Sequence, residues 1–209
     1  MSRTKLAVAA LGLALASGHA NAFLIDNVGD SLNFSWSYAG GEYNLTGAGT
    51  MTATALSAGS LTLQISLTNN TVAASGIDAR LTAFGLGIDP DATGVSFGDA
   101  IDGGMINASL DSIPSLKTID VCAFGGPNCS GGGNGGIFAN GASDIFSLTI
   151  TGGFANRVTI DPLGYKYQTD VGSFEFSCST TSTTGQCRGG RTVPEPGSLA
   201  LLGQSPRLT

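Results

Sequence analysis

Runs of alternating apolar and polar residues recur along most of the chain. Between Leu61 and Thr68, leucine and isoleucine alternate with Thr, Gln and Ser. Leu32–Tyr38 shows the same alternation, with aromatic residues on the apolar side. Because successive side chains of a strand point to opposite faces, each run predicts a strand with one apolar and one polar face.

Further short strands are predicted between turn signals such as Ser57-Ala58-Gly59 and Thr151-Gly152-Gly153. They are Tyr43–Leu45, Thr50–Leu56, Arg80–Ile88, Lys117–Val121, Ile145–Ile150, Arg157–Ile160 and Val171–Phe176. Many strands with one apolar face each must pack face to face. The pattern therefore predicts an all-β fold, a single antiparallel β-sandwich or jelly-roll-like domain.

Three stretches interrupt the strand pattern. Asp89–Gly104 and the glycine-rich Gly125–Gly136 are predicted as loops, and the second is expected to be mobile. Ser179–Thr192 is rich in Ser, Thr, Gly and Arg and is interpreted as a spacer. The domain is therefore expected to span residues 23–187, followed by a spacer and tail at 188–209.

The first 22 residues have the three parts of a secretory signal. Arg3 and Lys5 precede an apolar stretch at Leu6–Ala16, and small residues precede Ala22. A membrane-spanning segment needs about 20 apolar residues, and this stretch is shorter. Cleavage is expected between Ala22 and Phe23, which predicts an exported protein with no membrane span in the mature chain.

Cleavage would also remove His19, the one histidine of the chain. A mature protein without histidine has no Ser-His-Asp or Cys-His machinery and no zinc site of the usual histidine-containing kind. The formal net charge of −6, with only nine Lys and Arg, argues against nucleic-acid binding, which depends on neutralising phosphates. Charged residues make up 11% of the chain, about half the usual share. These features favour a non-enzymatic protein.

The four cysteines all lie in the predicted mature chain. An even number in a secreted protein favours disulfides. Of the three pairings, the two local ones, Cys122 with Cys129 and Cys178 with Cys187, are preferred because each closes a loop of small residues. A zinc site made of all four cysteines is the alternative, although these spacings are longer than those of usual zinc pairs.

One aspartate-rich segment resembles half of a calcium loop. Asp89, Asp91 and Thr93 precede Gly94 with the spacing of the first ligands of an EF-hand loop, and Asp99 follows. Ala100 occupies the twelfth position, where a glutamate is expected. The segment is interpreted either as a weak extracellular calcium site or as ordinary turns, in which Asp and Gly are common. No cofactor other than calcium is expected.

Exposed aromatic residues form a second candidate site, since sugars stack on aromatic rings. Trp36, Tyr165 and Tyr167 are the candidates for such a carbohydrate-binding surface. Trp36 is in phase with Leu32 and Phe34, which favours a place in the core instead. A hydrolase would need paired carboxylates in a cleft, and the sequence indicates no such pair.

Near the C-terminus, Val193-Pro194-Glu195-Pro196 leads into Gly-Ser-Leu-Ala-Leu-Leu-Gly. This phrase resembles the PEP-CTERM sorting signal of Gram-negative bacteria, in which a Pro-Glu-Pro motif precedes a membrane helix and a basic cluster. The resemblance implies processing by an exosortase-type membrane protease. Here the apolar segment is short and Arg207 is the only basic residue after it, so the sorting signal is interpreted as truncated.

Phe23–Ser35 and Leu81–Pro90 are similar to the domain of PEP-CTERM proteins called the cistern family. The resemblance implies a secreted protein without enzymatic activity that accompanies exopolysaccharide and biofilm production. We therefore expect a structural protein at the outer surface or in the extracellular matrix, with the periplasm as the other location. A carbohydrate-binding module, with extracellular polysaccharide as its partner, is the alternative.

Overall fold

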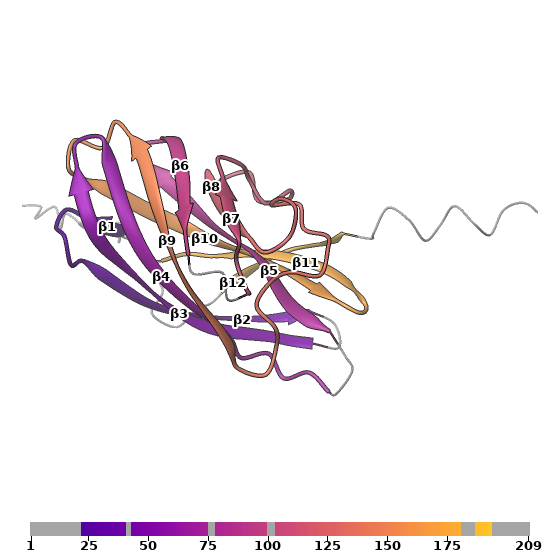
Figure 1. The fold of residues 1–209 in the computed structure, drawn as a ribbon. Helices are drawn as coiled ribbons and strands as arrows, with labels where there is room; N and C mark the ends of the chain where they lie inside the picture. Colours follow the sequence, from indigo (N-terminus) through magenta and orange to yellow (C-terminus); the bar gives the residue numbers. More distant parts are fainter. Residues whose placement is uncertain (1–21, 41–42, 75–77, 100–102, 181–186, 194–209) are drawn as a thin grey trace, which may run out of the picture.

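The computed structural model describes residues 22–40, 43–74, 78–99, 103–180 and 187–193. Within these ranges the regular structure consists of strands, and no helix is present. Two antiparallel sheets pack against one another (Figure 1). The predicted all-β sandwich is confirmed.

The smaller sheet has five strands. Its order is β2 (Ser31–Gly40), β3 (Tyr43–Ser57), β4 (Ser60–Asn69), β9 (Ala142–Gly152) and β6 (Ala92–Gly98). Ala58 and Gly59 form the tight connection between β3 and β4, because Ser57 pairs with Ser60. The turn predicted there is confirmed.

The larger sheet has seven strands. Its order is β12 (Cys187–Val193), β11 (Gly172–Cys178), β10 (Val158–Thr169), β5 (Ala79–Asp89), β8 (Val121–Phe124) and β7 (Asn107–Ser109), and β1 (Phe23–Ile25) also pairs with β10. Both the first and the last strand therefore belong to this sheet.

Some segments differ from the sequence-based expectation. One long strand, β3, replaces the two predicted at Tyr43–Leu45 and Thr50–Leu56. β6 lies in the predicted loop Asp89–Gly104, because Val95 and Phe97 pack on the core from an edge strand. β12 lies in the predicted spacer, where the backbone pairs with β11. The strand predicted at Lys117–Val121 is instead a turn followed by irregular backbone, and β8 begins at its last residue.

Aromatic rings connect the two sheets across the core. Trp36 of β2 stacks on Tyr165 of β10 with ring centroids 4.5 Å apart, and Tyr38 stacks on Phe176 of β11 at the same distance. Stacked aromatic pairs contribute about 0.5–1.5 kcal/mol beyond the area that they bury. The apolar sides of the alternating runs thus form one continuous core.

A third layer covers the outer face of the seven-stranded sheet. We call residues 110–120 and 125–131, on either side of β8, the cover; its Ile113, Leu116 and Ile119 form a second apolar cluster with Ala83 of β5. Glycines in β5 and β10 make room for it, since a Cβ atom on Gly164 would lie 2.9 Å from Ile119 side-chain atoms. This layer explains why Gly85 and Gly87 of β5 are buried, since they lie close to Ile119 and Thr118 of the cover.

Candidate functional site

The three aromatic residues proposed as a sugar-binding surface lie in the core. Trp36 is 2% exposed, and Tyr165 and Tyr167 are fully buried. The expectation of an exposed aromatic surface on these residues is therefore wrong, whereas the in-phase position of Trp36 correctly placed it in the core.

Two of these side chains belong to a buried hydrogen-bond network. Trp36 Nε1 donates to Tyr167 Oη at 2.9 Å, and Tyr167 Oη donates to Asn69 Oδ1 at 3.2 Å. Asn69 Nδ2 in turn donates to the carbonyl oxygens of Ala79 and Ile137, each at 2.9 Å. Burial raises the pKa of Tyr167 above its ordinary value, so the hydroxyl stays neutral and the network is structural.

Tyr165 and Tyr167 provide a matched test of this network. Tyr165 Oη is buried without a hydrogen-bond partner among the described residues, and burial raises its pKa well above the ordinary value. We expect Tyr167→Phe to lower the free energy of unfolding by about 1–3 kcal/mol, because it leaves Trp36 Nε1 unpaired. We expect Tyr165→Phe to leave it unchanged or to raise it by about 1 kcal/mol. Urea denaturation measures both values; equal losses would contradict the assignment.

The proposed calcium ligands do not converge. Asp89 ends β5 and Asp91 precedes β6, whereas Thr93 lies within β6 and its hydroxyl donates to the Thr151 carbonyl oxygen. Asp99 follows the far end of this extended strand, roughly 20 Å from Thr93 at about 3.3 Å per residue. An EF-hand-like loop would have to curl around the ion, so the predicted ligand set is wrong. In the described ranges, no group of three or more His, Cys, Asp or Glu side chains is placed to hold a metal.

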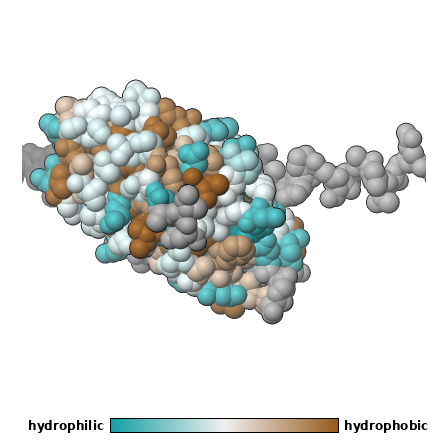
Figure 2. Space-filling model, in the orientation of Figure 1, coloured by the Kyte–Doolittle hydropathy of each residue, from teal (hydrophilic) through white to brown (hydrophobic). Residues whose placement is uncertain are grey.

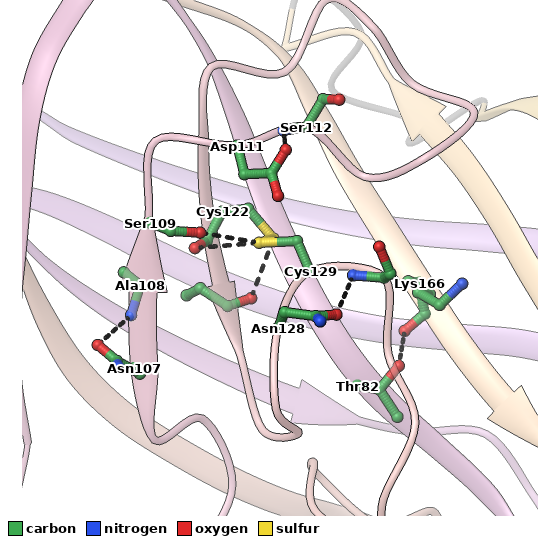
Figure 3. Close-up of a disulfide and its surroundings, with 12 residues drawn as sticks. Thr82, Asn107, Ala108, Ser109, Asp111, Ser112, Cys122, Asn128, Cys129 and Lys166 are labelled. Atoms are coloured by element: carbon green, nitrogen blue, oxygen red, sulfur yellow. Dashed lines mark hydrogen bonds between the residues drawn. A yellow bond between two sulfur atoms is a disulfide. The ribbon is translucent and has the colours of Figure 1, made fainter.

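The predicted bridge between Cys122 and Cys129 is confirmed. It joins β8 to the cover, with Cα atoms 6.1 Å apart, and both cysteines are fully buried. Figure 3 shows the loop with Asn128 and Cys129 near Lys166 and Thr82 of the seven-stranded sheet. Cys178 is disulfide-bonded, and the register places it opposite Cys187. The second local bridge, between Cys178 and Cys187, stays a prediction.

An ion pair is buried beneath the cover. Lys166 of β10 and Glu175 of β11 are direct register partners, and their Nζ and Oε1 atoms are in contact. The two side chains are 5% and 0% exposed. The backbone N–H of Ser115 in the cover donates to the other carboxylate oxygen at 2.8 Å. The carboxylate thus connects the cover to the sheet.

The carboxylate of Glu175 is held in its charged form. Burial acts to raise its pKa, but hydrogen bonds from Lys166 and Ser115 outweigh burial, so the pKa lies below the ordinary glutamate value. A group that is already paired on both oxygens is poorly suited to general acid or base chemistry. Glu175 is therefore a structural residue.

This lowered pKa predicts a pH-dependent stability. The contribution of Glu175 is fully present above the ordinary glutamate pKa of about 4.3 and is lost as the pH falls through the lower folded value. In denaturation experiments from pH 7 to pH 3, we expect the stability difference between wild type and Glu175→Gln to shrink with falling pH. The pKa of Asp30 is also lowered, by the backbone N–H groups of Asp26 and Asn27. Asp30 is present in both proteins, so its titration does not change the difference between them. A constant difference across this range would contradict the expectation.

The outer face of the five-stranded sheet carries a different kind of surface. We call it the hydroxyl face, and its register places uncharged residues in rows that cross β2, β3, β4 and β9. Three rows define it: Ser31, Thr52, Gln64 and Ser147; Asn33, Thr50, Ser66 and Ile145; and Ser35, Ala48, Thr68 and Ser143. The surface over β4, β9 and β6 is largely pale in Figure 2, the colour of weakly polar residues.

Hydroxyl groups on this face bond to one another across strands. Ser31 Oγ and Thr52 Oγ1 are 2.9 Å apart, and Thr68 Oγ1 and Ser143 Oγ are 2.8 Å apart. A hollow of about 280 Å³ lies on the face. It is lined by Asn33, Phe34, Ala48, Gly49, Thr50, Ser66 and Thr68. Sequence reasoning identified the polar positions of these strands but did not treat them as a site, since Ser and Thr are common on solvent-facing strands.

The predicted processing sites flank the domain. β1 begins at Phe23, directly after the predicted cleavage position at Ala22. Val193 is the last residue of β12, while Pro194, Glu195 and Pro196 lie outside the described residues. In the ranges that the structure describes, no helix is long and apolar enough to cross a membrane.

Comparison with known proteins gives no relative. No protein-family model, no curated protein and no solved structure matches the chain. The fold and the surface described above are therefore the basis for a functional proposal.

Proposed function

We propose that this protein is an exported, non-enzymatic structural component of the outer surface or extracellular matrix of a Gram-negative bacterium. The signal-like segment at residues 1–22 supports export. Every strand in the part of the chain that the structure describes follows Ala22, so cleavage at the predicted position leaves these strands intact. The domain is thus compatible with a mature chain that starts at Phe23.

The Cys122–Cys129 disulfide is the observation that carries the proposal. Disulfides persist in oxidising compartments and are rare in the cytosol. This one is fully buried and fastens the cover to β8. Its structural position supports a protein that folds outside the cytoplasm.

The chemistry of the chain supports a role other than catalysis. His19, the single histidine, lies in the signal-like segment. The Glu175 carboxylate is paired with Lys166 and Ser115, and the Tyr167 hydroxyl is hydrogen-bonded to Trp36 and Asn69. These buried polar groups stabilise the sandwich and are not presented to a substrate.

The C-terminal phrase at Val193–Pro196 supports delivery to the surface. Its resemblance to a PEP-CTERM signal suggests an exosortase-type protease as a partner, and the shortened apolar segment after it makes processing the point to test. Carbohydrate binding is the second candidate function, and it is favoured by the hydroxyl face rather than by the buried aromatic residues.

Fractionation of the native host into medium, outer membrane and periplasm tests this proposal, with intact-mass measurement of both chain ends. We expect a chain that begins at Phe23, in the medium or on the outer membrane. A mature end near Pro194 would support sorting. Retention in the cytoplasm with residues 1–22 still attached would overturn the proposal.

A further inference from the structure

We propose that the hydroxyl face binds neutral, hydroxyl-rich polysaccharide. The proposal deepens the function given above and rests on it in one respect: an exported protein meets such polymers. The surface is large because it extends over four of the five strands of a sheet.

The absence of charge on this face determines the class of ligand. None of the twelve residues in the three rows that define it is ionisable. An anionic polymer would find no cation there and would meet a protein whose formal net charge is −6. A neutral polymer is desolvated at less cost than a charged one, which favours an uncharged partner.

The hydrogen-bonding groups match a polymer of hydroxyls. Each Ser or Thr hydroxyl has one donor and two acceptor positions. The pair of Ser31 and Thr52 uses one donor and one acceptor between them, so a donor and several acceptor positions remain. Strand geometry repeats such groups about every 4.8 Å across strands and roughly every 6.8 Å along them. A sugar chain can therefore form many weak hydrogen bonds at once.

Shape and a small apolar contact add to this surface. The hollow at Ala48, Gly49 and Thr50 gives a sugar unit a place to enter. In the same row as Thr50 and Ser66, Ile145 is 57% exposed. An aliphatic side chain among hydroxyls can contact the C–H groups of a sugar ring.

A folded protein partner fits this face less well. The centres of protein–protein interfaces are enriched in aromatic residues, Met and Arg, and depleted in Ser. Ser, Thr, Asn and Gln dominate the three rows instead. The composition thus favours a hydroxylated polymer as the occupant.

Native gels that contain a polysaccharide test the proposal on the purified mature chain. The probes are dextran, hydroxyethyl cellulose and soluble starch as neutral polymers, and alginate as an anionic one. We expect at least one neutral polymer to retard the protein and alginate to have no effect. Since the protein is purified, a failure to bind would leave the proposed export and location untouched.

Variants assign the binding to this face. Thr50→Val removes a hydroxyl while keeping a β-branched side chain, and the double variant Ser66→Glu/Thr68→Glu places charge beside the hollow. We expect the double variant to lose binding by about tenfold or more and Thr50→Val to weaken it less. Val171→Glu is the control, because it adds one glutamate, half the charge of the double variant, at an exposed residue between β10 and β11 of the other sheet.

Thermal unfolding of each variant checks that the sandwich is intact. The proposal is supported if the double variant and Thr50→Val are folded but bind more weakly, while Val171→Glu binds like the wild type. Unchanged binding in the folded Thr50→Val and double variants overturns it. Retardation by alginate alone, or binding to no polymer, also overturns it.

Discussion

Replacing Lys166 by methionine will lower the free energy of unfolding by about 3–5 kcal/mol. Its ammonium group is buried against Glu175 beneath the cover, and removal leaves an unpaired carboxylate in a water-excluded position. Breaking a buried ion pair from one side costs this much because the remaining charge has lost its compensation. Urea denaturation at pH 7 measures the change.

Lys117→Met is the matched control. Lys117 is an exposed lysine of the cover whose Nζ donates to Ser112 Oγ, and its loss should change stability by no more than about 0.5 kcal/mol. The double variant Lys166→Met/Glu175→Gln should recover part of the loss, because no charge stays buried. If Lys166→Met and Lys117→Met were equally stable, the pair would have no structural role.

Removing the disulfide with Cys122→Ala/Cys129→Ala will cost about 2–3 kcal/mol. A bridge with a sequence separation of 7 restricts a short loop of the unfolded chain, which corresponds to this range in the chain-entropy account. Two buried sulfur atoms are also lost from the small cluster under the cover. Denaturation of the variant under non-reducing conditions gives the value.

Hydrogen exchange distinguishes a local effect from a global one. The cover packs through its own cluster, separate from the main core. We therefore expect amides between Ser115 and Ser130 to exchange faster in the double alanine variant, while those of β4 keep their protection. Uniform loss of protection across both sheets would show that the cover does not open as a separate unit.

Strand positions were predictable where one face meets the core and the other meets solvent. The alternation at Leu61–Thr68 predicted β4 with nearly its observed bounds. Its neighbours β3 and β9 pair with it edge to edge, so its polar face stays exposed to solvent. β6 and β12 were missed, since edge strands rich in Gly, Ser and Thr carry little alternation. β5 was recognised as a strand, but burial of its second face depends on residues some thirty positions further along the chain.

The candidate sites were less predictable than the strands. Tyr165 and Tyr167 flank Lys166, and the sequence alone does not say which side of β10 faces the sandwich core. That assignment also decides whether Lys166 is solvated or buried, and here the cover buries it. The aspartates at Asp89 and Asp91 have calcium-like spacing, yet the extended path of β6 carries Asp99 away from them. The hydroxyl face could not be predicted from the sequence, because its rows form only when four strands pair in this register.

Both ends of the domain lie in one sheet. β1 pairs with β10, and β12 pairs with β11, so neither the first nor the last strand takes part in the five-stranded sheet. A tether at either end of the domain therefore attaches to the seven-stranded sheet, the one that carries the cover. An anchored copy would keep its uncharged, hydroxylated side free to face its surroundings, and fluorescent or affinity fusions can be joined at either end without interrupting that side.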